Sequence, residues 1–347
     1  MHSSLKDKLQ KILDKHTASG SECGCQLAVY QDGELIADLA SGYTSADKTV
    51  PLTQEHLFPV FSVGKAVATT AVHKLVEKGI LSYDTRIGDV WKEFDCSGKE
   101  NVLLWHVLSH RSGLFQDPEI DSPDDYSDWQ KFTSRLAAAE PAWEPGTKSS
   151  YHYHTYAYLL GETAARAAGK DFKTIIEEEV IRPLKLENEM FFGTNDEADK
   201  RFVMLSGEHT YSHLLRSKRF LHGFAPSFNG VMTARAVAKH YAALEREIDG
   251  VRLLKQETLD NAAINRTPAE FPVNDWPRFG LGYVTFGFED DLSGVIGHGG
   301  AAGSEGLLDR RRHLAVGFTK NQVNPNHPVH PVRDEIAQAL GLPIRHW

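Results

Sequence analysis

A serine and a lysine stand one helical turn apart in the stretch Ser62-Val63-Gly64-Lys65. A serine hydroxyl is a poor nucleophile until a base removes its proton, and a lysine three residues later on the same helix face can reach that proton. The amine acts as a base only if burial lowers its pKa. The pair therefore indicates acyl transfer through a covalent serine intermediate.

The same Ser-x-x-Lys spacing occurs three times, at Ser3/Lys6, Ser45/Lys48 and Ser62/Lys65. The first lies at the terminus, where disorder is common, and the second follows a turn-rich stretch. Ser62 instead begins a helix that is apolar on more than one face and is closed by Gly79. The positive end of that helix would support a developing oxyanion. We place the nucleophile at Ser62; the alternative is a serine cap beside a lysine that only covers the surface.

Tyr151 is the candidate for moving the proton to the leaving group. It lies in Tyr151-His152-Tyr153, after a Pro-Gly loop and before a helix, so it could be aimed into a cleft. A phenol beside a lysine ammonium can ionise and act as a base. The alternative is an aromatic-rich helix start that only packs.

A third candidate element is His298-Gly299-Gly300, which follows a short strand. Consecutive glycines let a substrate lie directly against the backbone. The amide of Ala301 could then supply one oxyanion N–H and that of Ser62 the other. The alternative is a flexible glycine-rich turn.

The hydrophobic periodicity predicts which elements hold these residues. We expect an amphipathic helix over 5–16, and strands over 25–31 and 34–40 joined by the hairpin signal Asp32-Gly33. Residues 80–265 are mostly helical, with helices over 103–108, 129–139, 156–168, 172–181 and 234–245. Short strands follow over 279–288, 293–297, 303–309 and 314–320, and a last helix over 331–342.

Strands thus lie at both ends of the chain and helices in the middle. The simplest architecture is an α/β fold of the α+β type, in which the terminal strands form one antiparallel sheet flanked by helices. We expect a single domain over 1–347. Its approximate lobes are an α/β lobe of 1–80 plus 266–347 and an inserted, mainly helical lobe of 81–265, with the reactive site between them.

Composition narrows the class of function. The chain has 347 residues and a formal net charge of −9, which argues against a nucleic-acid partner. Three cysteines, Cys23, Cys25 and Cys96, have no metal or redox spacing, so we expect free thiols. The N-terminus has no apolar targeting core and no stretch is long enough to span a membrane. We therefore expect a cytoplasmic protein.

We expect no metal and no cofactor. The chain has seventeen histidines, but they do not form a ligand pattern such as His-Glu-x-x-His. His152 and His154 are two residues apart. His327 and His330 fall in a Pro-rich stretch, 324–331, that is typical of a loop.

Taken in order, the motifs resemble the serine β-lactamase-related superfamily, which holds class C β-lactamases, D-alanyl-D-alanine carboxypeptidases and family VIII carboxylesterases. The matching stretches are FSVGK (61–65), GILSYDTRIGDVW (79–91), LLWHVLSHRSGL (103–114), WEPGTKSSYHYHTYAYLLGE (143–162), PSFNGVMTARAVAKHYAAL (226–244) and GHGGAAGSEGLLD (297–309). The resemblance implies the β-lactamase/transpeptidase-like fold. It also implies that Ser62 is acylated, that Lys65 is its base and that Tyr151 shuttles the proton.

Two positions depart from the pattern that the resemblance implies. Tyr153 stands where the lactamases often carry the asparagine of Tyr-x-Asn, and His298 stands where penicillin-directed members carry a lysine. A histidine is a weaker anchor for an anion, and at its ordinary pKa it would change charge near neutrality. We therefore expect His298 to give a pH-dependent preference for anionic substrates.

The sequence favours a serine hydrolase that forms an acyl-enzyme on Ser62, with a small-molecule ester or amide as its partner. A carboxylesterase on short-chain or neutral esters is the main hypothesis. The alternatives are a β-lactamase or a D-aminopeptidase/transpeptidase-like amidohydrolase, a transacylase, and a non-catalytic binding scaffold. The substrate, the choice between hydrolysis and transfer, and the oligomeric state stay open.

Overall fold

A computed structural model describes residues 2–207, 209–270, 278–287, 291, 293–323 and 331–343. Within this part of the chain, a seven-stranded antiparallel sheet has the order β2-β1-β10-β9-β8-β7-β6. Its strands are β1 (Gly24–Gln31), β2 (Glu34–Gly42), β6 (Arg278–Phe279), β7 (Val284–Thr285), β8 (Val295–Gly299), β9 (Glu305–Asp309) and β10 (Leu314–Lys320). The predicted sheet from both chain ends is confirmed.

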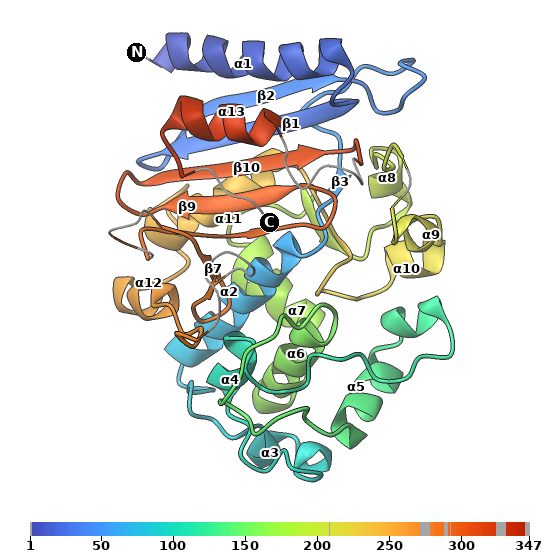
Figure 1. Ribbon diagram of the computed structural model, residues 1–347, viewed down its shortest axis with the longest axis vertical. Helices are drawn as coiled ribbons and strands as arrows, with labels where there is room; N and C mark the ends of the chain where they lie inside the picture. The colour runs from blue at the N-terminus through green and yellow to red at the C-terminus, as the bar shows by residue number, and fades with distance from the viewer. Residues whose placement is uncertain are drawn as a thin grey trace.

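The hairpin β1–β2 turns at Asp32 and Gly33, as the dipeptide predicts. Both residues have positive φ, 51° and 90°, which a two-residue turn that matches the strand twist requires. β1 also pairs with β10, where Cys25 lies opposite Lys320. Figure 1 shows the first and last strands side by side in the upper half of the molecule.

The two faces of the sheet are covered by different helices. On one face α1 (His2–Ser19) and α13 (Pro331–Leu340) pack with Leu27, Val29 and Val316. On the other face α11 (Ala234–Glu245) packs against β1, β9 and β10. Successive residues of a strand point to opposite faces of the sheet. Ala28 and Ala315 therefore belong to the hydrophobic cluster on the face that α11 covers.

Most of the remaining helices lie in the lower half of Figure 1 with the buried helix α2 (Val63–Glu77), and the others lie at the right-hand side of the molecule. The remaining helices are α3 (Ile87–Val90), α4 (Leu104–Leu108), α5 (Trp129–Ala138), α6 (Thr155–Ala168), α7 (Phe172–Ile176), α8 (Asp196–Asp199), α9 (Ser212–Leu215), α10 (Lys218–His222) and α12 (Gln256–Ala263). Single turns lie at Lys92–Phe94, Pro123–Ser127 and Glu177–Ile181. A small sheet, β3 (Phe58–Pro59), β5 (Gly230–Met232) and β4 (Met190–Phe192), leads into α2.

Three expectations need correction or fall outside this description. The strand expected over 279–288 is split into β6 and β7, because Gly280 approaches the Ala262 carbonyl and Gly282 has φ 87°. α11 packs on the sheet, although the predicted lobe boundary at 265 assigns it to the helical lobe. The stretch 324–330, with His327 and His330, and residue 288 lie outside the described residues.

Cys23, Cys25 and Cys96 are free thiols in the structure. Among the described residues, none of the helices combines the length and the apolar character that crossing a bilayer requires.

Candidate active site

Ser62 lies at the start of α2, directly after a segment whose backbone is strained. β3 pairs with β5, and the Val60 amide continues this ladder by donating to the Gly230 carbonyl at 2.9 Å. Phe61, the next residue, is buried with φ 48°, a left-handed conformation that is uncommon for a bulky residue. Ser62 then occupies the helix N-cap without capping the helix through its side chain, which leaves the hydroxyl for other contacts.

Lys65 lies completely buried under Ser62. Its Nζ atom is 3.0 Å from Ser62 Oγ, 2.6 Å from the Tyr153 carbonyl oxygen and 2.8 Å from the Ser227 carbonyl oxygen. Burial lowers the pKa of Lys65 well below its usual value, and the Asp117 carboxylate opposes this shift. The amine is therefore poised to accept a proton rather than to hold one.

The two carbonyls fix the direction of the amine. A neutral amine has two hydrogens and one lone pair, so donating to Tyr153 and Ser227 turns the lone pair toward Ser62. Ser227 is not among the predicted site residues, although it lies in one of the stretches that carry the resemblance. Its contribution comes from a main-chain oxygen, which any residue type supplies, so the side chain gives no signal.

Tyr151 is buried beside the same pair. Its ring centroid lies 5.0 Å from Lys65 Nζ, and its Oη atom is 3.4 Å from Nε2 of His298. Burial raises the pKa of Tyr151 above its usual value, while a hydrogen bond with Ser62 lowers it. The phenol thus stays protonated, so the resting pair is a neutral amine and a neutral phenol rather than an ammonium and a phenolate.

His298 does not behave as the sequence leads us to expect. It is 4% exposed, and burial lowers its pKa to about 3. Its Nδ1 atom lies 2.8 Å from the Gly299 carbonyl, so Nδ1 carries the hydrogen and Nε2 accepts from Tyr151. The expected change of charge near neutrality is therefore wrong, because the ring is buried and neutral.

Gly300 and Ala301 follow β8 into a tight turn that lies against Val60, two residues before Ser62. The Gly300 amide donates to Ser304 O at 2.7 Å, and a Cβ atom on Gly300 would lie 2.2 Å from Val60 O. Only glycine permits this approach to the segment that precedes Ser62. Within the described residues neither the Ser62 amide nor the Ala301 amide has an acceptor, so both are available to an oxyanion.

A family model described as Beta-lactamase matches residues 9–341. The chain belongs to the Beta-lactamase family. Esterase/beta-lactamase LipL of Mycobacterium tuberculosis is 28% identical over 338 residues, which cover 86% of this chain and 77% of that protein.

Two solved structures match almost the whole chain. A family VIII carboxylesterase superposes with a TM-score of 0.88 at 26% identity, covering 96% of each chain. A penicillin-binding protein homologue from Caulobacter crescentus has a TM-score of 0.86 at 27% identity, covering 97% of each. These comparisons confirm the predicted β-lactamase-related resemblance, the predicted fold and the predicted class, a serine hydrolase.

In this β-lactamase-family chain, Tyr153 lies at the mouth of the site. Its side chain is 50% exposed and its ring meets that of Tyr151 edge-on at 4.8 Å. His152, between them, points into the core, where its ring nitrogens lie 2.7 Å from Ser112 Oγ and from Ser150 O. His152 therefore supports the loop and does not face Ser62.

A polar network that sequence reasoning missed lies beside the mouth. Nδ1 of His154 is 2.5 Å from the Asp117 carboxylate and Nε2 is 2.9 Å from Tyr211 Oη. The Tyr211 ring packs 5.7 Å from that of Phe61, the residue before Ser62. These residues are far apart in the chain and have no motif spacing, so only the fold brings them together.

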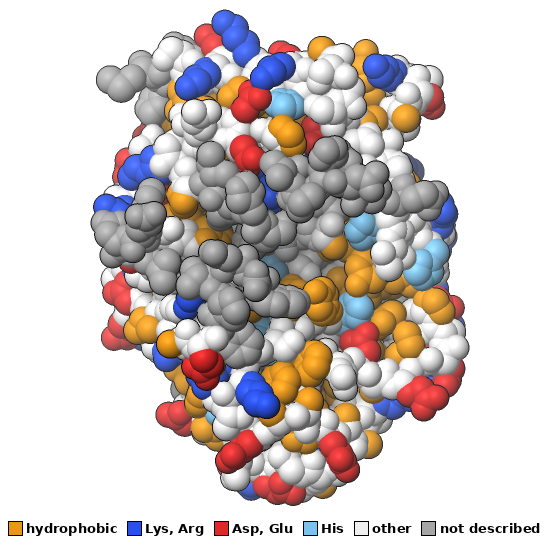
Figure 2. All heavy atoms as spheres, viewed as in Figure 1, with side chains coloured by type: hydrophobic (Ala, Val, Ile, Leu, Met, Phe, Trp, Pro, Cys, Tyr) orange, Lys and Arg blue, Asp and Glu red, His pale blue; other side chains and the backbone are white. Residues whose placement is uncertain are grey.

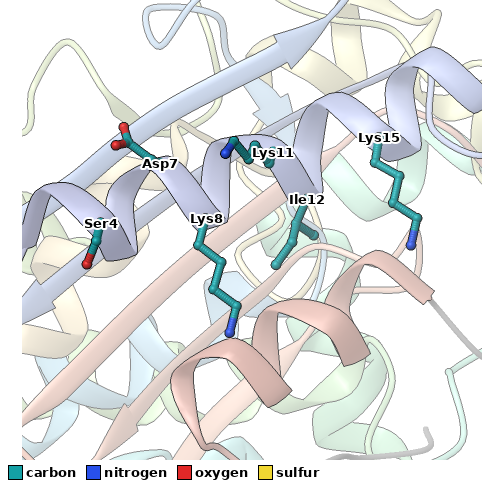
Figure 3. A pocket seen from close by; sticks show the side chains of 6 residues that line it. All are labelled: Ser4, Asp7, Lys8, Lys11, Ile12 and Lys15. Carbon is teal, nitrogen blue, oxygen red and sulfur yellow. The ribbon is translucent and has the colours of Figure 1, made fainter.

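The surface reflects this arrangement. Figure 2 shows hydrophobic and histidine side chains gathered to the right of centre on this face, between the sheet and the helical half. A hollow of about 450 Å³ lies elsewhere, along α1. Figure 3 shows its lysines, Lys8, Lys11 and Lys15, on that helix at the outer edge of the sheet, away from α2.

Two further patterns form no catalytic group. Ser45 Oγ donates to Asp47 at 2.6 Å rather than meeting Lys48. Among the described residues, Asp196, Asp199 and His222 are close enough to hold a metal ion. His222 and Asp199 are already paired at 2.8 Å, however, and Lys218 pairs with Asp196 at 2.9 Å.

Proposed function

We propose that this protein is a serine carboxylesterase that forms an acyl-enzyme on Ser62 and acts on neutral esters. The observation that carries the proposal is the buried amine of Lys65, 3.0 Å from Ser62 Oγ, with both of its hydrogens directed to main-chain carbonyls. A buried neutral amine aimed at a serine hydroxyl is an activated nucleophile.

In the acylation step, Lys65 takes the hydroxyl proton as Ser62 Oγ bonds to the ester carbonyl carbon. The resulting ammonium has three hydrogens and three acceptors, Ser62 Oγ and the two carbonyls, so the charged state is also satisfied. The amides of Ser62 and Ala301 receive the oxyanion. No large rearrangement is needed between the two states of the amine.

The leaving alkoxide takes its proton from Tyr151. When the bond between the carbonyl carbon and the alcohol oxygen breaks, the Tyr151 phenol donates to that oxygen and recovers a proton from the Lys65 ammonium. The alcohol leaves, and Lys65 is neutral again. A water molecule then gives a proton to the same base, attacks the acyl-enzyme and releases the acid, while Ser62 regains its hydrogen.

The proposed substrate class follows from the side chains at the mouth of the site. His298 is neutral and its Nε2 atom is engaged by Tyr151, so it offers no cation to a substrate carboxylate. Tyr153 offers an exposed aromatic surface in the same cleft. The similarity to a family VIII carboxylesterase supports an ester substrate, whereas LipL is named as both an esterase and a β-lactamase.

The similarity to a penicillin-binding protein homologue leaves the amidohydrolase alternative open. A transacylase would use the same acyl-enzyme. A cytoplasmic location, the absence of a nucleic-acid partner and the absence of a cofactor stay predictions.

The test combines a covalent probe with a substrate panel. We expect a fluorophosphonate to add one label to the intact protein and none to Ser62→Ala. We also expect p-nitrophenyl acetate and butyrate to be cleaved far faster than a chromogenic cephalosporin. Labelling that persists in Ser62→Ala would refute the nucleophile, and faster cleavage of the cephalosporin would favour the lactamase alternative.

A further inference from the structure

A second cavity, of about 600 Å³, lies apart from Ser62 and has two guanidinium groups in its wall. It is formed where the segment before α3, together with α4 and the segment after α4, meets α12 and the segment that follows α12. The lining residues that matter are Tyr83, Asp84, Trp105, Arg111, Arg266 and Leu281. The mechanism proposed above uses none of them.

Neither guanidinium has a carboxylate partner. Among the described residues, no Asp or Glu oxygen lies within 4.0 Å of Arg111 or Arg266. Arg111 instead donates to two carbonyls, those of Arg266 at 3.1 Å and of Gly146. Arg266 donates through Nη2 to Asn261, which leaves its Nη1 hydrogens without an acceptor in the described structure.

Bringing the two charges together has a cost, and among the described residues no carboxylate within ion-pair range offsets it. The Nε atoms of Arg111 and Arg266 are both buried without a hydrogen-bond partner. Burial lowers the pKa of both groups, and the charge of Arg266 adds to this for Arg111. Unpaired, partly desolvated cations are unfavourable, and a bound anion would relieve that cost.

The nearby acids do not take this role. Asp84 lines the cavity but is exposed and outside ion-pair range, and Glu270 acts on Arg111 only at longer range. His106, beside Arg111, has its pKa lowered to about 4 and is neutral. Tyr83 hydrogen-bonds through its hydroxyl to His73 at 2.9 Å.

One part of the wall is apolar. The Arg111 guanidinium lies over the Trp105 ring at 5.2 Å, and Tyr83, Pro268 and Leu281 also line the cavity. Polar groups of the lining come from Asn261, Asn265 and Thr267. A planar guanidinium held on an aromatic face presents its edge to a carboxylate. The apolar wall would suit a ligand with an apolar body.

We propose that this cavity binds a small organic carboxylate, with its carboxylate on Arg266 and Arg111 and its apolar body against Trp105. The site adjoins the catalytic wall without being part of it. The Arg266 amide donates to Phe279 O at 2.7 Å, and the Phe279 ring stacks on that of Tyr151 with centroids 5.8 Å apart.

Isothermal titration calorimetry with sodium benzoate on the full chain tests the proposal at fixed ionic strength and neutral pH. Benzamide, which has the same shape without the charge, and inorganic phosphate, which has the charge without the apolar body, are the comparison ligands. We expect saturable binding of benzoate, binding of both others weaker by about 10-fold or more, and a loss of about 10-fold or more in Arg266→Gln.

Two matched variants locate the site. Arg252→Gln removes an exposed arginine elsewhere and should leave benzoate binding unchanged. Tyr153→Ala alters the mouth of the active site and should also leave it unchanged. Absence of saturable binding, equal binding of benzamide or phosphate, or full affinity in Arg266→Gln would overturn the proposal, and so would a loss confined to Tyr153→Ala. None of these outcomes depends on whether Ser62 is acylated.

Discussion

Lys65 is the residue on which the proposed chemistry depends, because its three contacts suit both of its protonation states. As an amine it donates twice and accepts once, and as an ammonium it donates three times to the same atoms. An environment that fits both states lets a proton arrive and leave without moving heavy atoms. Tyr151 behaves differently. The sequence suggests a phenol that can ionise and act as a base, but burial raises the pKa of Tyr151, so the phenol keeps its proton.

We predict that Lys65→Arg loses about 10²-fold or more in kcat, because a guanidinium keeps its charge and cannot act as a base. The wild-type rate should fall on acidification, since lowering the pH through the depressed pKa of Lys65 protonates the base. Initial rates with a neutral p-nitrophenyl ester between pH 5 and pH 9 measure both effects. A pH-independent wild-type rate over an acid range in which the protein stays folded would contradict this assignment.

His298 supplies the second prediction at this scale. With its pKa lowered to about 3, the ring stays neutral from pH 5.5 to pH 8. The KM ratio between a carboxylate-bearing ester and a neutral ester of equal size should therefore be the same at both ends of this range. His298→Lys should lower that ratio by restoring a cation. If the wild-type ratio falls several-fold on acidification, His298 is protonated and the burial argument fails.

At the scale of elements, the site depends on the contact between the turn after β8 and the segment before α2. Phe61 has a left-handed conformation and Gly300 lies against Val60 O, so these two residues position the amides of Ser62 and Ala301 that we propose bind the oxyanion. Such strain persists only where the surroundings determine it.

We predict that Gly300→Ala lowers kcat by about 10-fold or more, because a Cβ atom 2.2 Å from Val60 O forces the two segments apart. Gly79→Ala is the matched control: its Cβ would enter open space, so its cost is limited to the strain of a positive φ at the end of α2. Its kcat should stay near the wild-type value. Equal kcat in both variants would mean that the turn does not position the oxyanion site.

The elements near the termini were predictable because their signals are local. Asp32-Gly33 specifies a turn by itself, and the start of α2 follows from the apolar helix pattern after Ser62. The predicted contact between the Ser62 and Lys65 side chains is also present in the fold. The carbonyl of Ser227 and the contact of Tyr211 with His154 depend on long-range packing, and the depressed pKa of His298 depends on burial. None of these is encoded in residue type or spacing.

At the scale of the whole molecule, the sheet connects the two ends of the chain. β1 lies next to β10 in the sheet. At the end of this strand pair, the Glu22 and Lys320 side chains form a buried ion pair 2.5 Å apart. Their side chains are 3% and 1% exposed. Burial raises the pKa of Glu22, and the charges of Lys320 and, at longer range, of Arg333 oppose this.

We predict that Lys320→Met lowers the free energy of unfolding by about 3 kcal/mol, because it leaves the Glu22 carboxylate buried beside an apolar side chain. The double variant Glu22→Gln/Lys320→Met should recover part of that loss, since no unpaired charge remains. Urea unfolding followed by circular dichroism measures the three proteins. Lys200→Met is the control, because it breaks an exposed pair with Glu197 and should cost no more than ~1 kcal/mol. Lys320→Met could lower the free energy of unfolding by no more than this control, or the double variant could be less stable than the single one. Either result would mean that the buried pair does not stabilise the contact between the chain ends. The β1–β10 pairing alone would then hold the sheet that carries His298 and Gly300.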